Sequence, residues 1–173
     1  MGRRFSDYDE SDVRIRPGTD IPVVWGMLWH IFQNGWEDKE FIKQRVYGME
    51  EVRAEVAKWH PREVERVTGL PEAQLKRMAQ TFATQKPATL IWCMGATQKT
   101  VGTANVRAYS ILLLATGNVG KPGTGVNPLR GQNNVQGSCD MGSFPHELPG
   151  YCHVADDATR ESFEAIWGAK LDN

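Results

Sequence analysis

Cysteine is scarce in this 173-residue sequence, and its placement excludes several kinds of site. Cys93, Cys139 and Cys152 are an odd number at wide spacing, which argues against a secreted disulfide framework. No Cys-x-x-Cys or Cys-x-x-x-Cys pair occurs, so the chain has no iron–sulfur or zinc ligand set of its own. His146 and His153 flank Cys152 loosely, and we interpret them as neighbouring loop residues rather than as metal ligands.

Long apolar runs and an excess of one charge are also missing. Residues 1–10 contain no apolar core of a signal peptide, and no later stretch is long enough for a membrane span. Charged residues make up 24% of the chain and the net charge is −1, which does not favour nucleic acid as a partner. With its unpaired cysteines, the chain is expected to be cytoplasmic, with no membrane span and no nucleic-acid partner.

Amides and glycines are concentrated in one segment, residues 127–142, which also holds Arg130. Glycine lets backbone approach a ligand closely, amides bind hydrogen-bonding edges, and an arginine fork holds anions or carboxylates. A purely structural loop seldom needs these residue types together. The segment therefore predicts a polar wall against a large ligand.

Patterning in the first half predicts mostly helices. Residues 12–16 alternate polar and apolar, which is typical of a half-buried strand. Residues 21–34 are apolar nearly all round and predict a buried helix, with Thr19 or Asp20 as its cap and Gly35 as its stop. Several short helices follow between residues 37 and 86, one of them beginning at Pro61.

The second half adds a strand, a helix and a long irregular region. Residues 88–94 form a continuous apolar run, which indicates a strand buried on both faces of a parallel sheet, and residues 103–116 predict a helix. Residues 117–150 show no helical or strand period and are expected to form ordered loops, before a last helix at 158–168.

The predicted fold is an α/β open parallel-sheet unit with flanking helices and a long ordered Gly/Asn/Gln-rich loop region. Residues 1–11 are an N-terminal extension, residues 12–150 the α/β segment, and residues 151–173 a helical tail.

Polar segments follow several of these elements. If the two strands share a sheet, the turn 16–20, the loop 94–98, the loop 117–125 and the amide-rich segment would converge, because ligands bind at the carboxyl ends of parallel strands. Asp20 can accept two hydrogen bonds from guanine, and glycine backbone can hold a pyrophosphate. A nucleotide-bearing cofactor is therefore our hypothesis.

Simpler interpretations stay open for single motifs. From composition alone, a turn and helix cap is the favoured explanation of residues 16–20, and a core position that of Met94. Residues 117–120 can be explained by a Schellman helix end. Residues 120–125 do not form a phosphate-binding Walker loop, because Lys-Ser/Thr does not follow the second glycine at the required spacing.

Together these motifs resemble the catalytic subunit of molybdenum- or tungsten-dependent formate dehydrogenases, in the molybdopterin oxidoreductase (DMSO reductase) superfamily. The resemblance covers nearly the whole chain after its first ten or so residues, and its most specific segments are residues 92–98, 117–137, 139–142 and 148–151.

The resemblance implies oxidation of formate to carbon dioxide at a metal, Mo or W, held by a bis-molybdopterin guanine dinucleotide. It implies that Arg130 orients the formate carboxylate, that Asp20 binds guanine, and that Gln132 lies beside the pterin. It also implies further contacts to the cofactor from Pro17, Gly18, Met94, Gly95, Thr97 and Gln98. Further implied partners are electron-transfer subunits.

Departures from the family pattern set limits. The metal-ligating cysteine or selenocysteine followed by histidine is missing. Cys152-His153 does not fit this role, because the family's dipeptide comes well before the segment that corresponds to residues 14–20. The four-cysteine iron–sulfur segment and the cap over the second dinucleotide are also missing, and Lys99 replaces the usual histidine or aromatic residue. We therefore expect an internal segment, inactive alone, that completes its site with the remainder of the subunit or a neighbouring chain. The alternatives are a non-catalytic cofactor-binding or interaction module and a segment of another molybdopterin oxidoreductase, such as a nitrate reductase.

Overall fold

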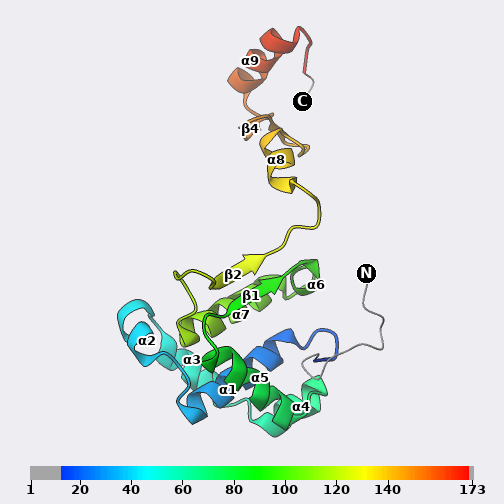
Figure 1. Ribbon diagram of the computed structural model, residues 1–173. Helices are drawn as coiled ribbons and strands as arrows, with labels where there is room; N and C mark the ends of the chain where they lie inside the picture. The colour runs from blue at the N-terminus through cyan, green and yellow to red at the C-terminus, as the bar shows by residue number, and fades with distance from the viewer. Residues whose placement is uncertain (1–12, 172–173) are drawn as a thin grey trace, which may run out of the picture. The chain divides into compact units, whose positions relative to one another are not determined.

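The structure is a computed structural model that describes residues 13–171. It divides into two compact units, Met1–Leu129 and Arg130–Asn173 (Figure 1). The boundaries predicted after residues 11 and 150 stay predictions, and residues 1–11 lie outside the described part of the chain. Among the described helices, none combines the length and apolarity that a bilayer crossing requires.

Helix α1 (Asp20–Asn34) is the centre of the first unit. It packs against α3 (Met49–Val56), α4 (Pro61–Thr68), α5 (Glu72–Thr84) and α7 (Gly102–Thr116). Leu28 and Ile31 are fully buried, and Gly35 ends the helix in the left-handed conformation. The predicted buried helix and its glycine stop are therefore confirmed.

Short helices surround this centre, as the sequence predicts. Asp38 caps α2 (Lys39–Arg45) by accepting a hydrogen bond from the Phe41 backbone N–H at 3.0 Å. Pro61 takes the first position of α4, where its missing N–H leaves no hydrogen bond unmade.

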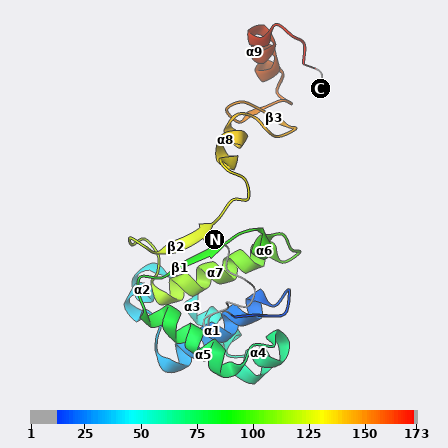
Figure 2. The ribbon, with the colours of Figure 1, turned by 45° about the vertical axis from the view of Figure 1, so that its right-hand side comes forward.

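A two-stranded parallel sheet covers α7. Strand β1 (Thr89–Trp92) pairs with β2 (Gly125–Pro128), with Thr89 opposite Gly125 and Trp92 opposite Pro128. The connection runs through α6 (Met94–Thr97) and α7, and the turned view shows α7 between the sheet and α1 (Figure 2). The parallel pairing of the predicted strand is confirmed.

Two strand predictions are wrong. Strand β1 is not buried on both faces: Leu90 and Trp92 pack against the core, whereas Ile91 is 56% exposed. Residues 13–16 form no strand, although they alternate, because Arg16 makes a single backbone bond to Thr68 O instead of a ladder. Asp12 lies outside the described residues.

The second unit contains α8 (Val135–Asp140), a small antiparallel hairpin and α9 (Asp157–Trp167). The hairpin joins β3 (Glu147–Leu148) to β4 (Cys152–His153). The expectation of loops alone from 117 to 150 is therefore wrong, because β2, α8 and β3 fall in this range. The sequence pattern did not indicate β2 and β3, because these strands are only two to four residues long and the segment is rich in glycine and proline.

Candidate functional site

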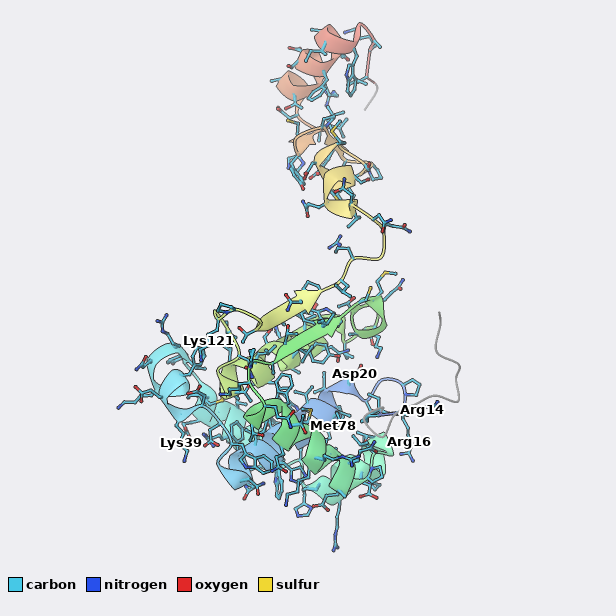
Figure 3. All side chains as sticks on the ribbon, in the orientation of Figure 1. Arg14, Arg16, Asp20, Lys39, Met78 and Lys121 are labelled. Carbon is cyan, nitrogen blue, oxygen red and sulfur yellow. The ribbon has the colours of Figure 1, made fainter. Side chains whose placement is uncertain are left out.

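Asp20 is presented by a tight turn at the start of α1. Thr19 donates to Arg16 O through both its backbone N–H, at 3.2 Å, and its hydroxyl, at 2.6 Å. Gly18 has a φ of +83°, and a Cβ added there would meet nothing within 4 Å. Thr19 takes the N-cap position, as predicted for Thr19 or Asp20, but neither side chain makes a capping hydrogen bond. Asp20 lies at the start of α1 (Figure 3), and its carboxylate is not engaged in capping that helix.

Lys99 and Tyr109 contact Asp20 from distant parts of the sequence. Lys99 Nζ lies 2.5 Å from Asp20 Oδ2, and the Tyr109 hydroxyl donates to Asp20 Oδ1 at 3.5 Å. The side chains of Lys99 and Asp20 are 28% and 16% exposed, so the ion pair is half-buried. Burial, followed by the negative charge of Asp20, raises the pKa of Tyr109 to about 12. The phenol therefore stays a hydrogen-bond donor at neutral pH.

The segment that carries Lys99 is fixed against the first turns of α7. Buried Asn105 donates from Nδ2 to Ala96 O at 2.7 Å, and the Gly102 N–H donates to Lys99 O at 3.0 Å. A Cβ on Gly102 would lie 2.0 Å from Thr97 O, so only glycine allows this approach. The backbone on both sides of Lys99 is therefore held by specific contacts.

An apolar cleft of about 300 Å³ opens beside Asp20. Its walls include Leu90 and Trp92 of β1 and Tyr109 of α7, with the Trp92 and Tyr109 ring centroids 5.6 Å apart. A second cavity, of about 490 Å³, is lined mainly by α5 and shares Met27, Met78 and Phe82 with the first, but no predicted site residue lines it. Figure 3 labels Met78. A single carboxylate at the edge of an apolar, aromatic cleft suits a ligand with a flat ring and hydrogen-bond donors.

The predicted loop at the carboxyl end of β1 is partly a short helix, α6. Met94 is 56% exposed, so the core interpretation of this residue is wrong. Gly95 has open space where a Cβ would be, Thr97 is exposed, and Gln98 ends the helix next to Lys99. Strand β2 ends at the same edge, where the Leu129 N–H donates to Trp92 O at 2.7 Å.

The loop 117–125 does not join this site. It follows the last residue of α7 and enters the amino end of β2, the opposite edge of the sheet. Gly117 is left-handed and the Asn118 N–H bonds to Leu113 O at 3.0 Å, which confirms the Schellman interpretation. The predicted convergence therefore holds for the turn 16–20 with the segment around Lys99, and is wrong for this loop.

Arg130 and Gln132 are exposed residues of the second unit. Some of the neighbouring amides have structural partners: the Asn134 side chain caps α8 by accepting from the Gly137 N–H, and Gln136 Nε2 donates to the Tyr151 hydroxyl at 2.7 Å. Arg130, by contrast, forms no ion pair with the residues that the structure describes.

Cysteine and histidine do not assemble a metal site in the described part of the chain, where no cluster of three or more potential ligands occurs. Cys93, Cys139 and Cys152 are all free thiols. His146 Nε2 and His153 Nδ1 lie 3.7 and 3.9 Å from the same oxygen, Glu147 Oε1.

Sequence reasoning identified Asp20 but missed its two partners. A tyrosine within the apolar helix 103–116 was an available signal, since a buried phenol requires a hydrogen-bond acceptor. Lys99 was noticed only as a departure from a motif, and no local pattern pairs it with a residue 79 positions earlier.

Comparisons with known proteins add a family and relatives. The family model described as molybdopterin oxidoreductase matches residues 2–170. The chain is 41% identical over 158 residues to formate dehydrogenase H of Escherichia coli, covering 91% of this chain and 22% of that protein. It is 40% identical over 172 residues to the alpha subunit of the F420-dependent formate dehydrogenase of Methanocaldococcus jannaschii, covering 98% of this chain and 25% of that protein.

A solved structure is also similar. Acetylene hydratase from Pelobacter acetylenicus matches with a TM-score of 0.58 and 29% identity, covering 60% of this chain and 14% of that one. The chain thus spans about a quarter or less of the length of these relatives.

Proposed function

Because the chain belongs to the molybdopterin oxidoreductase family, we propose that it forms part of the catalytic subunit of a formate dehydrogenase. The family predicted from the motifs is thereby confirmed. Relatives about 40% identical carry the name formate dehydrogenase, which favours formate over nitrate as the substrate. Since the chain spans about a quarter of these relatives, the activity is that of the whole subunit, and the 173 residues alone are inactive.

The single observation that carries the proposal is the Asp20 carboxylate. It follows the tight turn before α1, takes no part in helix capping and borders an aromatic cleft. Gly18 and Gly95 leave open space in the two polar segments of this unit that we assign to the cofactor. These features fit the guanine end of a molybdopterin guanine dinucleotide, because a carboxylate accepts from the N1–H and the 2-amino group of guanine.

The remaining predicted residues of the first unit are assigned to the same cofactor. Pro17 and Gly18 expose backbone at the turn before Asp20, and the exposed α6 segment offers the remaining contacts from Met94, Gly95, Thr97 and Gln98. In the bis-molybdopterin guanine dinucleotide form, the bound Mo or W supplies the two-electron oxidation of formate to carbon dioxide. An iron–sulfur cluster and electron-transfer subunits belong to parts of the enzyme outside this chain.

Arg130 is assigned to the formate carboxylate and Gln132 to the pterin beside it. A guanidinium is permanently charged and binds a small planar carboxylate through two parallel hydrogen bonds. Among the described residues, no carboxylate pairs with Arg130, so binding formate would break no ion pair within this part of the chain. The free thiols of this chain fit a reducing compartment, and we assign the enzyme to the cytoplasm.

The test measures formate-dependent dye reduction by the complete catalytic subunit. Replacing Arg130 by Met removes two charged hydrogen bonds and should lower kcat/KM for formate about 100-fold, whereas Arg130→Lys should retain part of it. Arg62→Met, at an exposed position of α4, is the matched control. Unchanged kcat/KM in Arg130→Met would overturn the substrate role, and formate oxidation by the isolated chain would overturn its incompleteness.

A further inference from the structure

We propose that Lys99 and Asp20 act as one guanine-binding pair, in which Lys99 donates to guanine O6 while Asp20 accepts from the N1–H and the 2-amino group. The inference rests on the proposed guanine dinucleotide cofactor and extends it to a residue that the family motif does not include. It identifies Lys99 as the residue that selects a 6-oxo purine.

The geometry of the Asp20–Lys99 pair leaves donors and acceptors to spare. Lys99 Nζ contacts one carboxylate oxygen at 2.5 Å, and an ammonium has three donors. Each carboxylate oxygen has two lone pairs, so Oδ2 can hold Lys99 and an N1–H together, and Oδ1 can hold the Tyr109 hydroxyl and an amino group. Guanine can therefore bind without separating the ion pair.

The order of groups on guanine matches this arrangement. Along its hydrogen-bonding edge, guanine presents the O6 acceptor, then the N1–H donor, then the 2-amino donor. An ammonium beside a carboxylate presents a donor followed by two acceptors, which is the complementary order. Adenine presents an amino donor at position 6 and an acceptor at N1, so its amino group would face the Lys99 ammonium and its N1 would face the Asp20 carboxylate. Polar groups left unpaired in this way at a half-buried site discriminate strongly against adenine.

The position of Lys99 is built into the fold. The Gly102 N–H holds its backbone carbonyl, the Asn105 side chain holds Ala96, and the close approach of Gly102 to Thr97 fixes the intervening segment. A lysine that served only as a surface charge would not need this support. Because the backbone is fixed, the ammonium reaches Asp20 without ordering a mobile loop, and little conformational entropy is lost when guanine binds.

The experiment uses the complete catalytic subunit prepared free of cofactor, with GDP, 6-thio-GDP and ADP as probes and calorimetry as the readout. Sulfur is a weaker hydrogen-bond acceptor than oxygen, so 6-thio-GDP tests the contact to position 6 alone. We expect the parent protein to prefer GDP over 6-thio-GDP about tenfold. Lys99→Met should bind GDP about tenfold more weakly and lose this preference, and Lys99→Arg should restore it.

Lys39→Met is the matched control, since Lys39 is an exposed lysine at the start of α2 (Figure 3). Equal weakening of GDP and 6-thio-GDP in Lys99→Met would overturn the inference, because Lys99 would then act only through the charge of Asp20. Asp20→Asn tests the proposed function separately: undiminished GDP binding by this variant would overturn guanine recognition by Asp20. Absence of GDP binding by the parent protein would overturn both.

Discussion

Gly26 of α1 faces Leu75 of α5 so closely that a Cβ on Gly26 would lie 2.6 Å from Leu75 Cδ2. The same Cβ would lie 2.9 Å from Val64 Cγ1 of α4. Leu75 and Val64 are fully buried, so neither can move into solvent. Helices α1, α4 and α5 therefore meet at a position that only glycine fills without strain.

Replacing Gly26 by Ala should destabilise the first unit. Overpacking a closed core costs about 1–3 kcal/mol, which exceeds the gain of up to about 1 kcal/mol from the better helix propensity of alanine. Urea unfolding of the chain followed by circular dichroism measures the difference. Gly95→Ala is the control, since a Cβ there meets nothing within 4 Å. A free energy of unfolding that rises in Gly26→Ala would contradict the packing described here.

Local patterns were sufficient for the longer helices, because a helix satisfies its hydrogen bonds within a short segment, whereas the short α6 and α8 had been expected to be loops. The apolar run 21–34 and Gly35 predicted α1 nearly to its ends, and Pro61 marked the first residue of α4. Strand β2 was missed because it contains a glycine and a proline and exists through pairing with β1, 36 residues away at Thr89 and Gly125.

In the candidate site, too, features set by local sequence were predicted and contacts between distant segments were not. Asp20 and the residues of α6 were identified because they form motifs contiguous in sequence. The Lys99 and Tyr109 contacts to Asp20 were not, because they depend on how α7 packs against α1. Residues 13–16 show the converse error: their alternation resembles a strand, but the structure offers no neighbouring strand to pair with them.

The lowered pKa of Asp38 predicts that the protein loses stability in acid. The backbone N–H of Phe41 and, to a smaller extent, Lys86 lower the pKa of Asp38 below its ordinary value of 3.8. A lowered pKa contributes stability above the unfolded value and loses it as pH falls through the folded value. Asp38→Ala should cost about 1 kcal/mol at neutral pH and remove this part of the acid transition, measured by urea unfolding at several pH values.

Asp38→Asn separates the two contributions. Asparagine keeps the cap to Phe41 but cannot pair with Lys86, whose Nζ lies 3.3 Å from Asp38 Oδ2. We expect most of the neutral-pH stability to remain while its dependence on pH near the carboxyl pKa disappears. Equal destabilisation by Asp38→Asn and Asp38→Ala would instead assign the stability to the ion pair.

The raised pKa of Tyr109 predicts a second loss of stability, this one in alkali. Burial and the charge of Asp20 raise the pKa of Tyr109 from 10.0 to about 12, so the unfolded chain loses this proton before the folded chain does. Stability from Tyr109 is therefore complete below about pH 10 and is lost as pH rises toward about 12.

Tyr109→Phe should remove that loss, and should delete the latest step in a tyrosinate absorbance titration of the folded protein. Tyr47→Phe, at a fully exposed position, is the matched control and should leave the alkaline stability unchanged. If Tyr109→Phe deletes an early step instead, the phenol is not held against Asp20, and the Asp20 carboxylate has one partner fewer than the geometry gives it.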